Sequence, residues 1–239
     1  MPNLHRTAAL ILSLLTPNFS PAAAPTCPPA PTQTLHLPAL YAALAAKRPI
    51  IIAALGSSST AGAMASDPAD SYPAKLQADL ARAFPSAEIS VINRGINGQD
   101  AKREDQRMAT DILSLHPQLI IWQVGANAAA RGEPVALFAH LVRIGLRRLH
   151  ATGADIILMD NQRSDRLRHQ PDNARINTAL SHLAQQSNVN LFSRDQLMRH
   201  WPNLHRFLAP DHMHLNDRGY ACTAQALTAA IRAARPHPP

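Results

Sequence analysis

From residue 49 onward, short runs of aliphatic residues alternate with longer segments in which apolar residues recur at helical spacing. A short, uninterrupted apolar run is typical of a strand that is buried on both faces of a sheet. The run at residues 50–55 is of this kind, and four further short, mainly aliphatic segments predict strands at residues 88–92, 119–124, 155–159 and 189–192. The amphipathic segments predict helices at residues 72–84, 101–115, 135–149, 174–186 and 218–232. This alternation predicts an α/β fold in which helices cover both faces of a parallel sheet.

Polar residues follow the first three predicted strands at the points where the strands end. These segments are 56–60 (GSSST), 93–98 (NRGING) and 125–127 (GAN). In open parallel sheets, ligands bind beyond the carboxyl ends of the strands. The three segments are therefore the first candidates for a functional site.

Ser58 lies in the first polar segment, and Asp211 and His214 lie in a loop near the end of the chain. Hydrolysis of an ester through a serine requires an exposed hydroxyl beside a neutral imidazole, and a carboxylate that fixes the tautomer of that ring. Gly56 allows a sharp turn directly after the strand. The alternative is that both segments are ordinary polar loops. The first could also be a phosphate-binding turn, although it lacks the glycine and lysine spacing of a P-loop.

Gly98 and Asn127 are candidate hydrogen-bond donors at the same edge of the sheet. A backbone N–H and a side-chain amide can stabilise the oxyanion that forms during acyl transfer. Equally, Gly98 can serve only as a turn glycine, and Asn127 only as a helix cap or turn residue.

Histidines are frequent near the end of the chain, so a metal site was considered there. His200, His205, His212 and His214 lie close to Asp211 in sequence. Their spacing matches no standard zinc pattern, and no obvious set of ligands emerges. We therefore expect no metal at this site.

In their order along the chain, these segments resemble the four sequence blocks of the SGNH (GDSL-like) hydrolases. Segment 56–60 is similar to the first block, usually Gly-Asp-Ser-x-Thr/Ser, and segment 93–98 resembles the second. Segment 125–127 is similar to the Gly-x-Asn block, and Asp211-His212-Met213-His214 to the Asp-x-x-His block. The resemblance spans about residues 50–232 and is most specific in the last block.

The resemblance implies a three-layer α/β/α sandwich with a flavodoxin-like, five-stranded parallel sheet and no cofactor. It assigns Ser58 as the nucleophile, with Ser57 and Ser59 as its rivals, and Asp211 and His214 as the other members of a catalytic triad.

The resemblance also implies an oxyanion hole formed by Ser58, Gly98 and Asn127, in which Gly98 fits the donor position better than Gly95. Two positions depart from the family pattern. Ser57 and Ala128 stand where aspartate is usual, and the change at position 57 places the usual support of the nucleophile turn in doubt.

A basic segment follows the fourth predicted strand. Residues 161–170 include Arg163, a candidate contact for an anionic substrate; the alternative, which the sequence favours, is a solvated basic loop. The chain has 239 residues and a formal net charge of +7, but its Lys and Arg residues are scattered. That distribution argues against a nucleic-acid-binding surface.

The first residues have the pattern of an export signal. A short apolar run at 7–15 precedes small residues at 20–24, so we expect a signal peptide at 1–24, a Pro-rich tether and lead-in at 25–48, and one hydrolase domain at 49–235. No apolar stretch in the mature chain is long enough to span a membrane. An exported location, periplasmic or secreted, would allow Cys27 and Cys222 to pair, although the sequence leaves that pairing open.

These features predict a serine esterase that acts on short-chain acyl esters, and the substrates we expect are O-acetyl groups on a carbohydrate of the envelope or outside the cell. The expected partner is a small-molecule or carbohydrate ester. Two alternatives remain: an O-acetyltransferase with the same triad, or a carbohydrate-binding scaffold without turnover. Neither the acyl group nor the oligomeric state follows from the sequence.

Overall fold

The structure, a computed structural model, describes residues 26–235, and the expected signal peptide at 1–24 lies outside the described residues. At its centre is a parallel sheet with the strand order β2-β1-β3-β4-β5. The strands are β1 (Ile50–Gly56), β2 (Ile89–Gly95), β3 (Leu119–Gln123), β4 (Asp155–Met159) and β5 (Asn190–Phe192). All five predicted strands are confirmed, as is the flavodoxin-like order.

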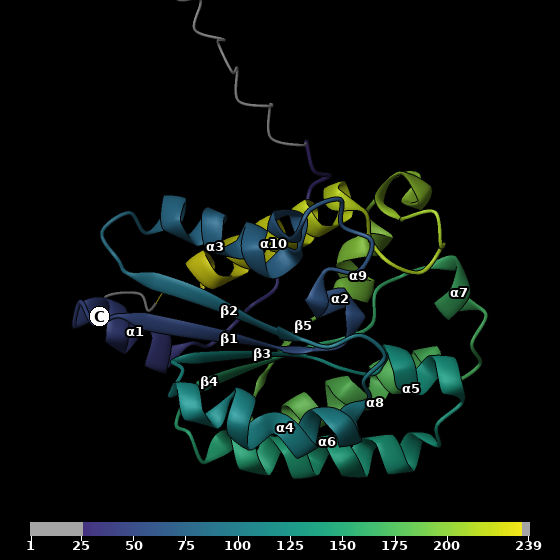
Figure 1. Ribbon diagram of the computed structural model, residues 1–239, viewed down its shortest axis with the longest axis horizontal. Coiled ribbons are helices and arrows are strands. Elements are labelled where there is room, and N and C mark those ends of the chain that lie inside the picture. The colour runs from purple at the N-terminus through teal and green to yellow at the C-terminus, as the bar shows by residue number, and fades with distance from the viewer. Residues whose placement is uncertain (1–25, 236–239) are drawn as a thin grey trace, which may run out of the picture.

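Helices cover both faces of this sheet (Figure 1). One face carries α1 (Pro38–Ala45), α3 (Tyr72–Ala83), α9 (Arg194–Arg199) and α10 (Asp217–Ala233). The other carries α4 (Ala101–Asp111), α5 (Ala126–Arg131), α6 (Val135–His150) and α8 (Asn173–Gln186). The remaining short elements are α2 (Ser58–Ala61), α7 (Asp165–Arg168) and the 3₁₀ helices η1 (Pro68–Asp70), η2 (Leu113–Leu115) and η3 (Leu204–Phe207). The predicted three-layer α/β/α sandwich is thus confirmed.

The position of β1 inside the sheet, between β2 and β3, explains why its sequence is apolar throughout. Ile50, Ile52 and Ala54 pack in the hydrophobic core on one side of the sheet. Ala53 and Leu55 pack in the core on the other side. Because alternate side chains of a strand point to opposite faces, a central strand between two helix layers needs apolar residues at every position.

The lead-in segment is more closely attached to the domain than a tether would be. Leu35 and Leu37 are buried in the core, and the unpredicted helix α1 packs on the same face. A disulfide joins Cys27 to Cys222 in α10, and the Arg218 side chain donates to the Thr26 carbonyl at 2.9 Å. The pairing that the sequence left open is therefore present, and it anchors the start of the described chain.

Glu104 is a fully buried acid in α4. Its Oε2 accepts a hydrogen bond from the Trp122 indole at 2.8 Å, whereas its Oε1 has no hydrogen-bond partner. Burial raises the pKa of this carboxyl to about 8, and the opposing effects of Trp122 and Arg107 are smaller. Folding therefore keeps Glu104 protonated at neutral pH.

This burial predicts a pH-dependent stability. Because the folded pKa of Glu104 lies above its unfolded value near 4.5, the native state binds the extra proton, and stability falls as pH rises from about 4.5 to 8. Glu104→Gln keeps an acceptor for Trp122 and removes this titration. We expect the variant to lose less stability than the wild type between pH 5 and 8, by an amount on the order of 1 kcal/mol or more. Urea unfolding across this range measures the effect, and parallel stability curves for the two proteins would contradict it.

Candidate active site

The turn that contains Ser58, the candidate nucleophile, lies where β1 ends at the carboxyl edge of the sheet. Strand β1 ends at Gly56, and helix α2 begins at Ser58. Helix α2 sits directly on the end of β2, where a Cβ on Gly95 would come within 2.1 Å of the Ala61 nitrogen. Gly95 is therefore needed for close packing, and its N–H donates to Asn93 Oδ1 at 2.9 Å. This use of the Gly95 N–H favours Gly98 as the candidate oxyanion donor.

The structure brings Ser58, His214 and Asp211 together in one hydrogen-bonded series. Ser58 Oγ lies 2.7 Å from His214 Nε2, and His214 Nδ1 lies 2.5 Å from Asp211 Oδ2. Ser58 comes from α2, and the other two residues come from the loop before α10, in which His214 is 156 residues away from Ser58 in sequence. This arrangement can transfer a proton from a serine hydroxyl to an imidazole whose tautomer is fixed by a carboxylate.

Asp211 also organises its own loop. Its Oδ1 accepts hydrogen bonds from the backbone N–H groups of Met213 and His214, both at 3.0 Å. Burial alone would raise the pKa of Asp211, but the hydrogen bonds from His214 and Met213 outweigh it, so the pKa is lowered. The carboxylate therefore stays ionised, as an orienting partner for the imidazole requires.

Gln123 supports the turn that contains Ser58 and was missed by the sequence analysis. This fully buried side chain ends β3, and its Oε1 accepts hydrogen bonds at 3.2 Å from Ser57 N, Ser57 Oγ and Thr60 Oγ1. Ser57, which replaces the usual aspartate, is thus tied to the neighbouring strand. The sequence signal was a lone polar residue at the end of an otherwise apolar strand.

Gln162 links helix α2 to the loop of Asp211 and His214. It is buried in the segment after β4, accepts from Ser59 Oγ at 3.2 Å and donates to the Met213 carbonyl at 3.2 Å. The hydroxyl of Ser59 is therefore buried and engaged, as is that of Ser57. Of the three consecutive serines, Ser58 alone is bonded to His214.

The segments that contain the two remaining candidate donors, Gly98 and Asn127, are hydrogen-bonded to each other. Asn127, near the start of α5, donates through Nδ2 to the carbonyl of Gln99 at 2.8 Å. Arg131 donates to the Gly98 carbonyl at 2.6 Å and to Asp100 Oδ2 at 2.9 Å. Gly98 has a φ of +74°, which glycine adopts without strain. These contacts hold the 98–100 turn against α5 and leave the second N–H of the Asn127 amide available.

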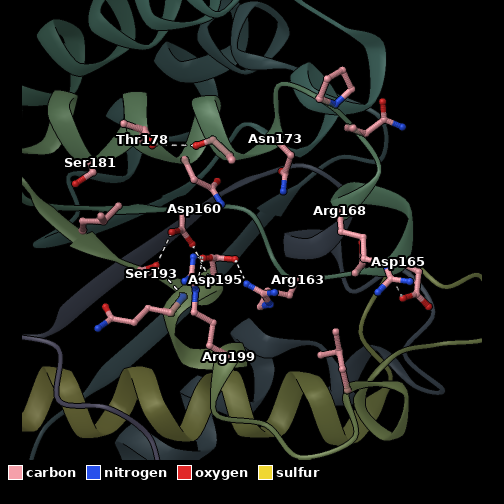
Figure 2. A pocket seen from close by; sticks show the side chains of 18 residues that line it. Asp160, Arg163, Asp165, Arg168, Asn173, Thr178, Ser181, Ser193, Asp195 and Arg199 are labelled. Atoms are coloured by element: carbon pink, nitrogen blue, oxygen red, sulfur yellow. Dashed lines mark hydrogen bonds and ion pairs between the residues drawn. The ribbon is translucent and has the colours of Figure 1, made fainter.

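Arg163 lies in a different environment from the one expected. Its Nη1 forms an ion pair with Asp195 Oδ1 at 3.0 Å, on the wall of a cavity of about 690 Å³ (Figure 2). The lining of this cavity includes Arg168 and Arg199 but none of Ser58, Asp211 and His214. A contact between Arg163 and a substrate therefore stays a prediction, and any such contact would be made with the guanidinium already paired to a carboxylate.

Solved structures show the same fold. A two-domain esterase active on acetylated mannans, co-crystallised with mannopentaose, is 23% identical over 87% of this chain, with a TM-score of 0.72. A lipase/acylhydrolase from Enterococcus faecalis is 20% identical over 77% of this chain and 95% of its own, with a TM-score of 0.66. An acetyl-xylooligosaccharide esterase from Geobacillus is 18% identical over 76% of this chain and 94% of its own, with a TM-score of 0.64. The chain spans about half of the two-domain esterase, 56% of its length.

Comparison with curated protein sequences finds no match. The family comparison is decisive, because the match at residues 24–235 covers all of the described residues. It confirms the predicted resemblance to SGNH-type hydrolases and the predicted class, a carboxylic-ester hydrolase. The chain belongs to the non-GDSL lipase-like family.

Proposed function

We propose that this SGNH-type esterase removes short acyl groups, above all O-acetyl groups, from a carbohydrate, and that it does so through an acyl-enzyme on Ser58. The observation that carries the proposal is the 2.7 Å separation between Ser58 Oγ and His214 Nε2, with Asp211 on the far side of the ring. A serine hydroxyl becomes a competent nucleophile when a positioned imidazole takes its proton.

In the proposed reaction, His214 Nε2 accepts the proton of Ser58 as Oγ attacks the carbonyl carbon of the ester. The tetrahedral intermediate then collapses, the alcohol leaves with the proton from His214, and Ser58 carries the acyl group. A water molecule activated by the same imidazole attacks the acyl-enzyme and releases the acid. Asp211 stabilises the imidazolium that forms in each step, since its lowered pKa keeps it ionised.

The oxyanion of the intermediate would be bound by the backbone N–H groups of Ser58 and Gly98 and by the side-chain amide of Asn127. The hydrogen bond from Asn127 to Gln99 supports this role, because it fixes the amide beside the turn that contains Gly98. Donors that are already oriented before the reaction cost no reorganisation when the negative charge develops.

The role of Asn127 is tested by replacing it with alanine. Loss of one oxyanion donor is expected to lower kcat by about 10²- to 10³-fold with little change in KM, because the donor acts on the transition state. Steady-state kinetics with an acetyl ester measures this change, with the melting temperature as a control for folding. A variant that keeps wild-type kcat, or one that loses only substrate affinity, would remove Asn127 from the oxyanion hole.

The proposed carbohydrate substrate is supported by two structural neighbours, whose names describe activity on acetylated mannans and on acetyl-xylooligosaccharides. A further argument is that residues 26–235, which the structure describes, contain no long insertion from which a lid over a long acyl chain could form. A carbohydrate substrate in the envelope or outside the cell agrees with the Cys27–Cys222 disulfide, since disulfides persist in oxidising compartments. Within residues 26–235, no helix is long and apolar enough to cross a membrane.

The substrate class is tested by comparing p-nitrophenyl esters of increasing acyl length with acetylated manno- and xylo-oligosaccharides. We expect acetyl esters to be the best substrates, with kcat/KM for octanoyl esters lower by about tenfold or more. Acetate release from the oligosaccharides would support the carbohydrate substrate. A preference for long acyl chains would contradict it, and transfer of acetyl to an added sugar in competition with water would make the protein an acetyltransferase instead.

A further inference from the structure

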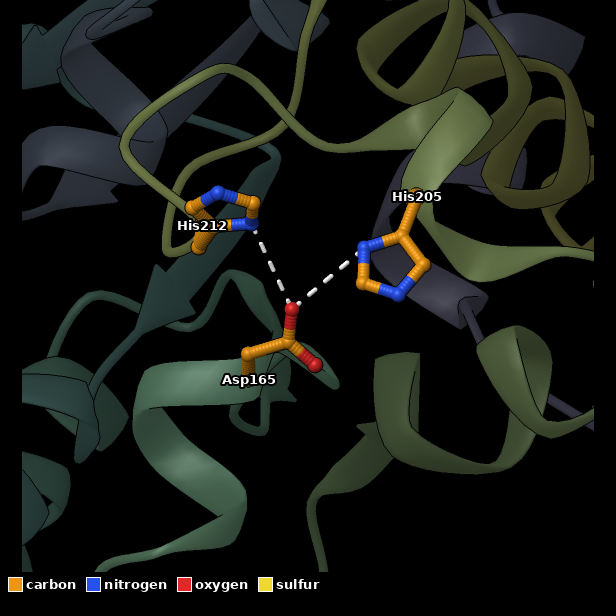
Figure 3. A group of neighbouring side chains, drawn as sticks. All are labelled: Asp165, His205 and His212. Atoms are coloured by element: carbon orange, nitrogen blue, oxygen red, sulfur yellow. Dashed lines mark ion pairs between the residues drawn. The ribbon is translucent and has the colours of Figure 1, made fainter.

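A second cluster of chemically active side chains lies beside the loop that contains Asp211 and His214. It consists of Asp165 in α7, His205 in η3 and His212 in that loop (Figure 3). One ligand atom from each of the three side chains lies within 4.8 Å of the other two. Three separate segments of the chain thus place two imidazoles and one carboxylate around a common point.

The two distances from the Asp165 carboxylate to the imidazoles suit metal ligands better than hydrogen bonds. Asp165 Oδ2 lies 3.4 Å from His205 Nδ1 and 3.4 Å from His212 Nδ1. An N–H···O hydrogen bond is usually about 2.7–3.2 Å long, so neither contact is a good one. For Zn²⁺ with bonds of about 2.0–2.1 Å, tetrahedral geometry separates two ligand atoms by about 3.3–3.4 Å.

The backbone of the loop at His212 is held next to α7, which contains Asp165. His212 has a left-handed φ of +56°, and its carbonyl accepts a hydrogen bond from the Arg166 N–H at 3.3 Å. That bond joins the loop to α7, the helix that begins with Asp165. Arg168 Nε approaches the other carboxylate oxygen, Asp165 Oδ1, at 3.6 Å, so Oδ2 is left to face the two rings.

We propose that Asp165, His205 and His212 form a Zn²⁺ site that ties α7 and η3 to the loop of Asp211 and His214. Two nitrogen donors and a single carboxylate favour Zn²⁺ over Ca²⁺ and Mg²⁺, which take mainly oxygen ligands. The rings of His205 and His212 are 64% and 62% exposed, so water can complete the coordination and small side-chain rotations can adjust the geometry. Because His212 lies between Asp211 and His214 in sequence, bound Zn²⁺ would restrain the loop that positions both. The site does not depend on the proposed esterase activity.

The test is Zn²⁺ binding to tag-free protein, measured by isothermal titration calorimetry and by the shift in melting temperature, with Mg²⁺ as the comparison cation. The wild type is expected to bind one Zn²⁺ per chain with micromolar or tighter affinity and to melt at a higher temperature when Zn²⁺ is present. His205→Ala and Asp165→Asn are expected to weaken binding by about tenfold or more and to abolish the thermal shift, since loss of even an outer-shell partner costs that much. His182→Ala, an exposed histidine in α8, is the matched control and should bind like the wild type.

Failure of the wild type to bind Zn²⁺ at micromolar concentration would overturn the proposal. So would equal affinity in His205→Ala and the wild type, because the ion would then bind elsewhere on the protein. Circular dichroism of each variant separates loss of the site from loss of the fold. Two variants on different elements keep the test decisive if one of them fails to fold.

Discussion

Ser58→Ala is expected to lower kcat for hydrolysis of p-nitrophenyl acetate by about 10⁴-fold or more. The reason is that the variant has no hydroxyl at the position 2.7 Å from His214 Nε2, so no acyl-enzyme can form. Ser58 is only partly buried, so its removal should leave the melting temperature nearly unchanged. Steady-state kinetics and thermal unfolding of the purified variant measure both quantities.

Ser59→Ala is the matched control. Its hydroxyl is buried and donates to Gln162, not to the imidazole, so we expect activity within about tenfold of the wild type. The reverse pattern, with an active Ser58→Ala and an inactive Ser59→Ala, would move the nucleophile to Ser59.

Asp211→Asn is expected to lower kcat by about 10⁴-fold while the protein stays folded. Asn can present an N–H to His214 Nδ1, which favours the tautomer that carries its proton on Nε2. Such a ring donates to Ser58 Oγ and cannot take its proton. Asp172→Asn is the control, because Asp172 forms an exposed ion pair with Arg175 near the start of α8. If Asp211→Asn and Asp172→Asn had the same small effect, Asp211 would have no part in the proton transfer.

The fold was predictable because β-strands buried on both faces have an unmistakable sequence pattern. The run at 50–55 has no polar residue, and the neighbouring strand β3 has one, Gln123 at its end, whereas the edge strand β2 is more polar. The long helices were predictable for a similar reason, since their apolar stripes recur over three or more turns. Their observed ends differ from the predicted ones by at most four residues, and several coincide.

The short helices and the packing of the lead-in were not predictable from these patterns. Helices α2, α5, α7 and α9 have only four to six residues, too few for a helical period to show. In the lead-in, Gln33, Leu35 and Leu37 are buried in alternation, but the prolines before them indicated an extended tether. Extended chain that packs on a domain and extended chain in solvent have the same local pattern.

The residues of the candidate triad could be named from sequence because short motifs carry them, whereas their supports could not. Gln123 and Gln162 act through contacts with residues between 51 and 103 positions away. The cluster of Asp165, His205 and His212 also depends on a long-range contact. The sequence drew attention to both histidines as metal ligands, but their carboxylate partner lies at least forty residues earlier. Long-range partners of this kind depend on the three-dimensional arrangement of loops and not on spacing in the chain.

The most direct test of the proposed mechanism is labelling with a fluorophosphonate probe, followed by mass spectrometry of the peptides. The probe forms a covalent bond with an activated serine hydroxyl, and activation is what the contact between Ser58 Oγ and His214 Nε2 provides. We predict a single label on Ser58, absent in Ser58→Ala and strongly slowed in His214→Ala. A label on another serine, or an active enzyme that takes no label, would contradict the assignment of Ser58 as nucleophile.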